Sequence, residues 1–177
     1  SDSISILASL IDSSLDLLAS LVNLLAIRHA LQPADKEHRF GHGKAEPLAA
    51  LGQSMFITGS AIMLLFQASG RLINPQPLTT GIELGIAVML FSMLATIGLL
   101  FLQRFVIIKT NSSAIRADSL HYRSDLLINF SVIIALFLSH FGLIWLDPLM
   151  AIFIAVYVLF SAWRILRDAV DLLMDHE

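Results

Sequence analysis

Two pairs of ionisable side chains lie in the middle of long apolar segments: Asp12 with Asp16, and His121 with Asp125. The spacing within each pair is i, i+4, so its two members share one face of a helix. An ionisable group inside a membrane span is energetically unfavourable and usually has a function. Three carboxylates and one imidazole are a four-ligand set for a divalent transition metal. This feature predicts metal binding within the membrane.

The composition is that of an integral membrane protein. Only 14% of the residues are charged and the mean hydropathy is +0.79, whereas soluble domains carry about 25% charged residues. The net charge of -3 gives no argument for a nucleic-acid partner, and none is expected; the absence of cysteine excludes disulfides and thiolate metal sites. No cleavable signal peptide is visible, because the first segment lacks a basic start and carries acids.

Five apolar segments are each long enough to cross a hydrocarbon core of about 30 Å as a helix. The predicted fold is therefore all-α, a polytopic transmembrane helical bundle that forms one domain over residues 1–177. The predicted spans cover about residues 4–27, 47–70, 81–108, 113–139 and 146–166. Proline or capping residues separate them at Gln32-Pro33, Asn74-Pro75-Gln76-Pro77, Thr110-Asn111-Ser112 and Asp147-Pro148.

The basic residues predict the orientation of the bundle. They gather in the first loop, around the third connection and at the C-terminal end: Arg28, Lys36, Arg39, Lys44, Arg104, Lys109, Arg116, Arg164 and Arg167. Since Lys and Arg favour the cytoplasmic side, these three regions are expected to be cytoplasmic. The N-terminus would then lie outside without a signal to bring it there. We therefore expect a further span before this chain, so that five of six spans are visible.

Polar residues form a stripe along one face of the first span and of the fourth. The stripes consist of Ser5, Ser9, Asp12, Asp16, Ser20 and Asn23, and of Asp118, His121, Asp125 and Asn129. Both must avoid lipid, and they do so by facing each other. The two helices are antiparallel, which places Asp12 at the depth of Asp125 and Asp16 at the depth of His121. Such ligands suit Zn²⁺, with Fe²⁺, Mn²⁺ or Cd²⁺ as alternatives.

For three residues near these stripes, the sequence indicates the role less specifically. Asp118 is either an acid at the helix end near Arg116 or part of an access path to the site. Arg123 is expected to reach toward the membrane surface or to pair with an acid. Glu83 is expected to be interfacial.

Other interpretations of the buried acids stay open or are disfavoured. A polar helix–helix seam or a proton relay without metal would use the same residues. An intramembrane aspartic protease is disfavoured because the acids form i, i+4 pairs without a Gly-x-Gly-Asp pattern. The run Gly41-His-Gly-Lys44 lacks the spacing of a phosphate loop. A channel would more often use a symmetric ring of like residues.

Three motifs resemble those of the cation diffusion facilitator family, in its bacterial zinc and ferrous-iron efflux branch. They are the Ser-x-Ser run leading into Asp12-x-x-x-Asp16, the run Asp118-Ser-Leu-His121-Tyr-Arg-Ser-Asp125, and the loop Ala34-Asp-Lys-Glu-His-Arg-Phe-Gly-His-Gly-Lys-Ala-Glu46. The resemblance covers essentially the whole chain. It implies an exporter in the bacterial inner membrane, not an enzyme, that exchanges a divalent metal for protons by alternating access.

The resemblance also assigns residues to roles. It implies a transport site formed by Asp12, Asp16, His121 and Asp125, with Zn²⁺ as the main substrate and Cd²⁺ or Fe²⁺ as alternatives. It implies a second metal site at Asp35, His38 and His42, and a charge interlock between Lys44 and Asp175. From spacing alone, His38 and His42 suit a metal only in a helix, and Gly41 and Gly43 favour a bend. The family forms homodimers and has six spans and a cytoplasmic C-terminal domain, so this chain is expected to be its transmembrane part.

Overall fold

The computed structural model of the chain describes residues 2–39, 41–73, 82–139 and 145–174, without the side chains of 2–13, 15, 82–88 and 139. The described residues form helices and no strand, so the all-α prediction is confirmed. The helices are α1 (Asp2–Ala30), α2 (Ala45–Ile73), α3 (Ile82–Thr110), α4 (Ser113–Ser139) and α5 (Leu146–Leu173). α1, α2 and α5 extend a few residues beyond the predicted spans, whereas α4 has the predicted bounds.

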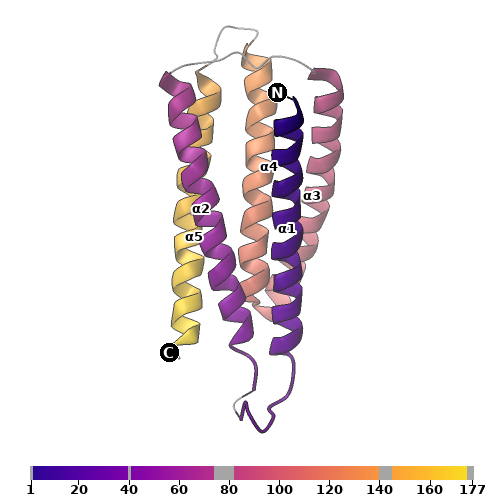
Figure 1. The fold of residues 1–177 in the computed structure, drawn as a ribbon, viewed down its shortest axis with the longest axis vertical. Helices are drawn as coiled ribbons and strands as arrows, with labels where there is room; N and C mark the ends of the chain where they lie inside the picture. Colours follow the sequence, from indigo (N-terminus) through magenta and orange to yellow (C-terminus); the bar gives the residue numbers. More distant parts are fainter. Residues whose placement is uncertain (1, 40, 74–81, 140–144, 175–177) are drawn as a thin grey trace.

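Consecutive helices run in opposite directions (Figure 1). The loop between α1 and α2, the turn between α3 and α4 and the last residues of α5 therefore lie at one end of the bundle, at the bottom of Figure 1. We refer to it as the first-loop end. It carries the three basic regions that the sequence predicts to share one side of the membrane.

The turn between α3 and α4 is closed by local side-chain chemistry. Asn111 adopts a left-handed conformation with φ 53°, and its N–H donates to the carbonyl of Ile107 at 2.8 Å. Asn tolerates this conformation better than most non-glycine residues. The next residue, Ser112, accepts the N–H of Ile115 on its Oγ at 3.2 Å and so caps α4. This short turn makes α3 and α4 antiparallel neighbours.

The most extensive helix contact joins α2 and α5, and small residues form it. On α5, buried residues recur at steps of three and four: Ala155, Val158, Ala162, Ile165 and Ala169. Opposite them, α2 contributes Ala50, Ile57 and Ala61 to the same cluster. Small side chains let helix backbones approach closely, and the heptad spacing keeps the contact on one face.

The outer surface of the bundle is suited to lipid. Four helical segments are long and apolar enough to cross a membrane: Ala45–Ile73, Met89–Thr110, Ser113–Leu138 and Leu146–Leu173. This count covers only described residues, and most side chains in the first half of α1 are outside them. Large apolar side chains such as Phe66, Phe91 and Phe153 are exposed on the bundle. Such a surface identifies a multi-pass membrane protein.

Candidate metal sites

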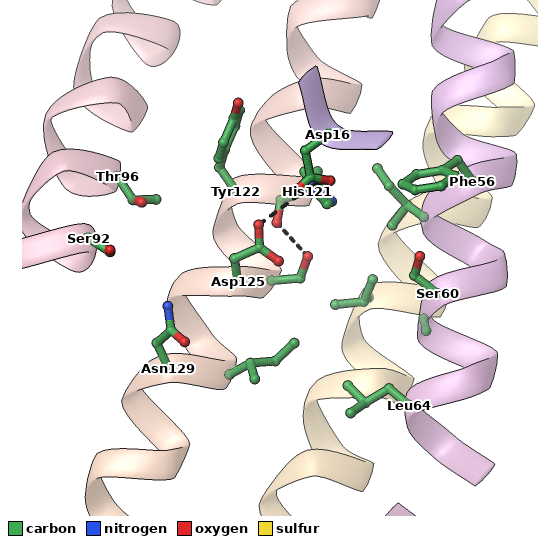
Figure 2. Close-up of a pocket in the computed structure, with 15 residues that line it drawn as sticks. Asp16, Phe56, Ser60, Leu64, Ser92, Thr96, His121, Tyr122, Asp125 and Asn129 are labelled. Carbon is green, nitrogen blue, oxygen red and sulfur yellow. Dashed lines mark hydrogen bonds and ion pairs between the residues drawn. The ribbon is translucent and has the colours of Figure 1, made fainter. Parts of the chain in front are cut away.

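The polar faces of α1 and α4 meet at His121. Its Nε2 lies 3.0 Å from Asp16 Oδ1 on α1 and 3.5 Å from Asp125 Oδ2 on α4 (Figure 2). The imidazole is largely buried, with 13% of the side chain exposed. The antiparallel arrangement thus places Asp16 at the level of His121, the level that the two stripes predict. One nitrogen is shared between two carboxylates from different helices.

The fourth predicted ligand, Asp12, lies in α1 one turn before Asp16, and its side chain is outside the described residues. Its part in the site stays a prediction. The described members of this cluster are joined through His121 and do not form a closed ligand set. A bound cation would take the place of the hydrogen bonds that now join them.

A cavity of about 570 Å³ adjoins the cluster. In Figure 2 its wall includes Ser92 and Thr96 of α3 on one side and Ser60 of α2 on the other. Along α4 the lining continues from Asp125 to Asn129, in the direction that leads away from the first-loop end. Hydroxyl and amide groups along this wall are suited to a hydrated path for ions.

On the opposite side of His121, polar contacts join α1, α3 and α4. Ser20 Oγ lies 3.4 Å from the Tyr122 hydroxyl. One step closer to the first-loop end, Asn23 Nδ2 donates to Asp118 Oδ1 at 3.4 Å, and Gln103 Nε2 of α3 donates to Asp118 Oδ2 at 2.8 Å. We call these five residues the polar ladder. A second, apolar cavity of about 630 Å³ lies between α1 and α2 on this side, and Asn23 is part of its lining.

The ladder changes the interpretation of Asp118. It faces α1 and α3 and accepts two amide hydrogen bonds there, so it is more than an acid at the helix end near Arg116. Arg116 instead contacts Asp168 Oδ2 at 3.3 Å and Asn111 Oδ1 at 2.7 Å. Gln103 was not predicted from the sequence. The signal for it was an amide side chain within the apolar third span, and the structure shows this side chain buried.

A second cluster lies in the first loop, at Asp35, His38 and His42. One ligand atom from each lies within 4.8 Å of the others, and it is the one such group of three in the part of the chain that the structure describes. His38 Nδ1 is 3.3 Å from Asp35 Oδ1, and His42 Nε2 is 3.5 Å from Asp35 Oδ2. Asp35 and His38 are half exposed, whereas His42 is buried.

The loop is bent, not helical, and still brings the three side chains together. Asp35 Oδ1 accepts the backbone N–H of Glu37 at 2.9 Å and of His38 at 2.6 Å. Gly41 has φ 81°, a conformation that favours glycine. The hydrogen bond from the His38 backbone is the main reason that the pKa of Asp35 is lowered from its ordinary value. The bend that Gly41 and Gly43 predict is present, and the three side chains come within ligand distance of one another without a helix.

The ring of His42 is enclosed by two others. His29, in the last turn of α1, and His38 both lie with ring centroids 4.4 Å from it. His42 Nδ1 is buried without a hydrogen-bond partner among the described residues. The loop cluster is thereby packed against the end of α1.

Lys44 connects the first loop to the end of α5. Its Nζ donates to the carbonyl of Leu173 at 3.1 Å. Its predicted partner, Asp175, is outside the described residues, so the charge interlock stays a prediction. The contact does place Lys44 beside the segment that carries Asp175.

Comparison with known proteins identifies related sequences along almost the entire chain. The family described as "Cation efflux transmembrane domain" matches residues 1–174. A protein named "Cation-efflux pump FieF" from Klebsiella pneumoniae is 50% identical over 173 residues, and its namesake from Yersinia pestis (strain Pestoides F) is 52% identical over 173 residues. Both alignments cover 98% of this chain and 57% of the relative. The chain thus spans little more than half the length of these relatives.

Proposed function

Since this chain belongs to the cation efflux family, also called the cation diffusion facilitators, we propose that it is the transmembrane part of a divalent metal exporter. The proposed main substrate is Zn²⁺, with Cd²⁺ or Fe²⁺ as alternatives, and protons are the counter-ions. The observation that carries the proposal is His121 Nε2 held between Asp16 and Asp125 beside a cavity within the bundle. Asp12 is the proposed fourth ligand.

The donor set favours a borderline cation over a hard one. An imidazole nitrogen with carboxylate oxygens suits Zn²⁺, Fe²⁺ and Cd²⁺, whereas Mg²⁺ and Ca²⁺ prefer oxygen alone. The lack of cysteine leaves no thiolate to shift the preference toward softer ions. The cation is a substrate, so the site must also release it, and incomplete closure of the ligand set is compatible with release.

Proton coupling follows from the hydrogen bonds of His121. Without a cation, a proton between the imidazole nitrogen and Asp16 Oδ1 joins these two groups. A metal ion needs the nitrogen lone pair and ionised carboxylates, so its binding displaces that proton. Protons arriving through the cavity then compete with the metal for the same atoms. Affinity is therefore expected to fall as the pH falls.

Alternating access is supported by the asymmetry around the cluster. The cavity beside His121 extends away from the first-loop end, whereas toward that end the hydrogen bonds of the polar ladder join α1, α3 and α4. With the first loop and the end of α5 in the cytoplasm, the described arrangement faces outward. In the alternate state we expect the contacts of Asn23 and Gln103 with Asp118 to open and the walls of the cavity to close.

The loop cluster of Asp35, His38 and His42 is proposed as a second, cytoplasmic metal site. It is exposed at two of its three ligands, so exchange with the cytoplasm is fast and its role is regulatory. We further propose a homodimer in the bacterial inner membrane, with Lys44 and Asp175 as the interlock at its cytoplasmic side. The relatives with this name come from bacteria.

The first prediction concerns Asp16. Purified chain in detergent is titrated with Zn²⁺ at neutral and acidic pH, together with Asp16→Ala and Asp12→Ala/Asp16→Ala. We expect the variants to lose the pH-dependent site, with affinity reduced at least about tenfold. The matched control is Asp35→Ala/His38→Ala, which should lose the loop site and keep the intramembrane one.

A structural bundle is the alternative that the polar ladder itself favours, since hydrogen bonds between helices stabilise membrane proteins without any cation. It predicts that Asp16→Ala lowers thermal stability but leaves Zn²⁺ stoichiometry as in the wild type. Unchanged Zn²⁺ binding in Asp16→Ala would refute the metal assignment, and equal binding at both pH values would refute the proton linkage. Transport belongs to the whole protein, and there Asp16→Ala should abolish Zn²⁺ uptake into vesicles.

A further inference from the structure

A groove of about 600 Å³ lies between α3 and α4 and contains two arginines. Arg104 of α3 and Arg123 of α4 line it together with the apolar residues Ile97, Leu100, Phe101 and Leu126. Arg123 lies two residues from His121 and two from Asp125, so it projects from a different face of α4 than the metal ligands. The groove is thus separate from the cavity beside the metal ligands.

Neither arginine has an acidic partner among the described residues. Other arginines of the bundle do have one, since Arg71 lies 3.5 Å from Asp147 and Arg116 lies 3.3 Å from Asp168. The acids of α4 are engaged elsewhere, because Asp118 accepts two amide hydrogen bonds and Asp125 contacts His121. One of the two expectations was that Arg123 pairs with an acid. Among the described residues it does not. Two positive charges in one apolar groove repel each other, and an anion bound between them would stabilise both.

The groove lies near the first-loop end, within reach of the headgroup region for a long side chain. Arg104 lies six residues before the end of α3 and Arg123 ten residues after the start of α4, which is about 9 Å and about 15 Å from the first-loop end. A helix of 29 residues is about 43 Å long and exceeds a hydrocarbon core of about 30 Å, so its ends reach the headgroup region. The Cα–Cβ bond of Arg123 tilts toward the start of α4, and its long side chain can extend to that region.

We propose that this groove binds an anionic phospholipid of the leaflet at the first-loop end. The guanidinium groups of Arg104 and Arg123 hold its phosphate, since arginine pairs with phosphate through parallel hydrogen bonds. One acyl chain follows the apolar wall formed by Ile97, Leu100 and Leu126. A basic pocket between membrane helices is suited to anionic headgroups. This site does not depend on the metal cluster.

The test uses the full chain, delipidated in detergent with a metal chelator present. It is titrated with phosphatidylglycerol or with phosphatidylcholine of the same acyl chains, and native mass spectrometry counts the bound lipid. We expect the first site to prefer phosphatidylglycerol about tenfold, because each arginine near a headgroup adds to the attraction. Arg104→Gln/Arg123→Gln should remove the preference, and Arg104→Lys/Arg123→Lys should keep part of it.

Arg164→Gln is the matched control. Arg164 is an exposed arginine of α5 that lies 5.3 Å from the Phe160 ring, outside the groove, and its removal should leave the preference intact. If Arg104→Gln/Arg123→Gln prefers phosphatidylglycerol as strongly as the unmodified chain does, the proposal is overturned. Displacement of the lipid by inorganic phosphate at equal concentration would also overturn it, since the groove would then bind phosphate without the acyl chain. If the double variant does not fold, Arg123→Gln alone should show a partial loss, and no loss would equally overturn it.

Discussion

At the residue scale, the proposed exchange of metal and proton depends on one atom. His121 Nε2 contacts carboxylates from two helices, and a proton and a divalent cation cannot occupy it together. In the proposed site, a histidine at this position also affects which cation is preferred. Nitrogen ligands favour Zn²⁺ over Mn²⁺ more strongly than oxygen ligands do.

His121→Asp is therefore expected to shift preference toward Mn²⁺. Competition between Zn²⁺ and Mn²⁺ at the intramembrane site measures this, in a background of Asp35→Ala/His38→Ala so that the loop does not contribute. We expect the ratio of Zn²⁺ to Mn²⁺ affinity to fall at least about tenfold. An unchanged ratio would mean that His121 is not the selective ligand.

The loop cluster should respond to pH through its imidazoles and not through Asp35. Backbone N–H groups, that of His38 first, lower the pKa of Asp35. A carboxyl with a lowered pKa contributes to metal binding as long as it is ionised. That contribution to binding is lost only as the pH falls through the lowered pKa, which lies below the ordinary value of about 3.9. Histidine as a class changes charge between pH 5 and 8.

Zn²⁺ binding to Asp12→Ala/Asp16→Ala, which keeps only the loop cluster, should thus be lost between pH 7 and pH 5. Titration at half-unit steps measures the midpoint. Asp35→Asn in the same background should weaken binding without moving that midpoint. A midpoint near pH 4 would assign the transition to the carboxylate and contradict the prediction.

At the scale of elements, α2 and α5 form a pair whose contact depends on small side chains. Ala162 is fully buried in this contact, as are Ala50 of α2 and Ala155 and Ala169 of α5. Their methyl groups leave no room for a longer side chain unless the helices separate. The polar face that carries the proposed metal ligands belongs to α1 and α4, and α4 also contributes Ala117 and Leu120 to the same buried core.

Ala162→Leu is expected to destabilise the chain by about 1–3 kcal/mol, because overpacking forces the α2–α5 contact apart. Thermal unfolding in detergent measures the change. Ala95→Leu is the control, since Ala95 is exposed on α3 and the same added volume there meets lipid or detergent. Equal effects at both positions would show that the α2–α5 contact is not tightly packed.

At the scale of the whole molecule, the connections between antiparallel helices place both candidate metal sites on one path. The loop cluster lies at the first-loop end, the polar ladder lies between it and the His121 cluster, and the cavity extends beyond His121. A cation that moved outward by the proposed route would meet them in this order.

The absence of cysteine allows this order to be tested with single introduced thiols in sealed vesicles. A membrane-impermeant maleimide should label Lys36→Cys from the side of the first loop and Ser60→Cys, in the cavity wall, from the opposite side. Phe66→Cys is the control, because Phe66 is exposed on the lipid-facing surface and should react from neither side. Labelling of Ser60→Cys from the side of the first loop would contradict the proposed outward access of the cavity.

The sequence by itself determined the helical bundle, the i, i+4 pairs and the level at which Asp16 meets His121. These follow from local periodicity, because the spacing of residues along a helix sets both the face and the depth of a side chain. For the same reason the all-α fold was predictable from five apolar segments.

Only the tertiary structure decided which polar groups join the helices beside the His121 cluster and which line the groove between α3 and α4. Gln103, Arg104 and Arg123 come from helices whose rotation about their own axes is set by packing against neighbours, and local spacing does not determine that rotation. The bent first loop is a second case, since hydrogen bonds to Asp35 rather than helical spacing bring His38 and His42 together. Contacts between distant segments depend on how whole helices pack, and that information is spread over the entire chain.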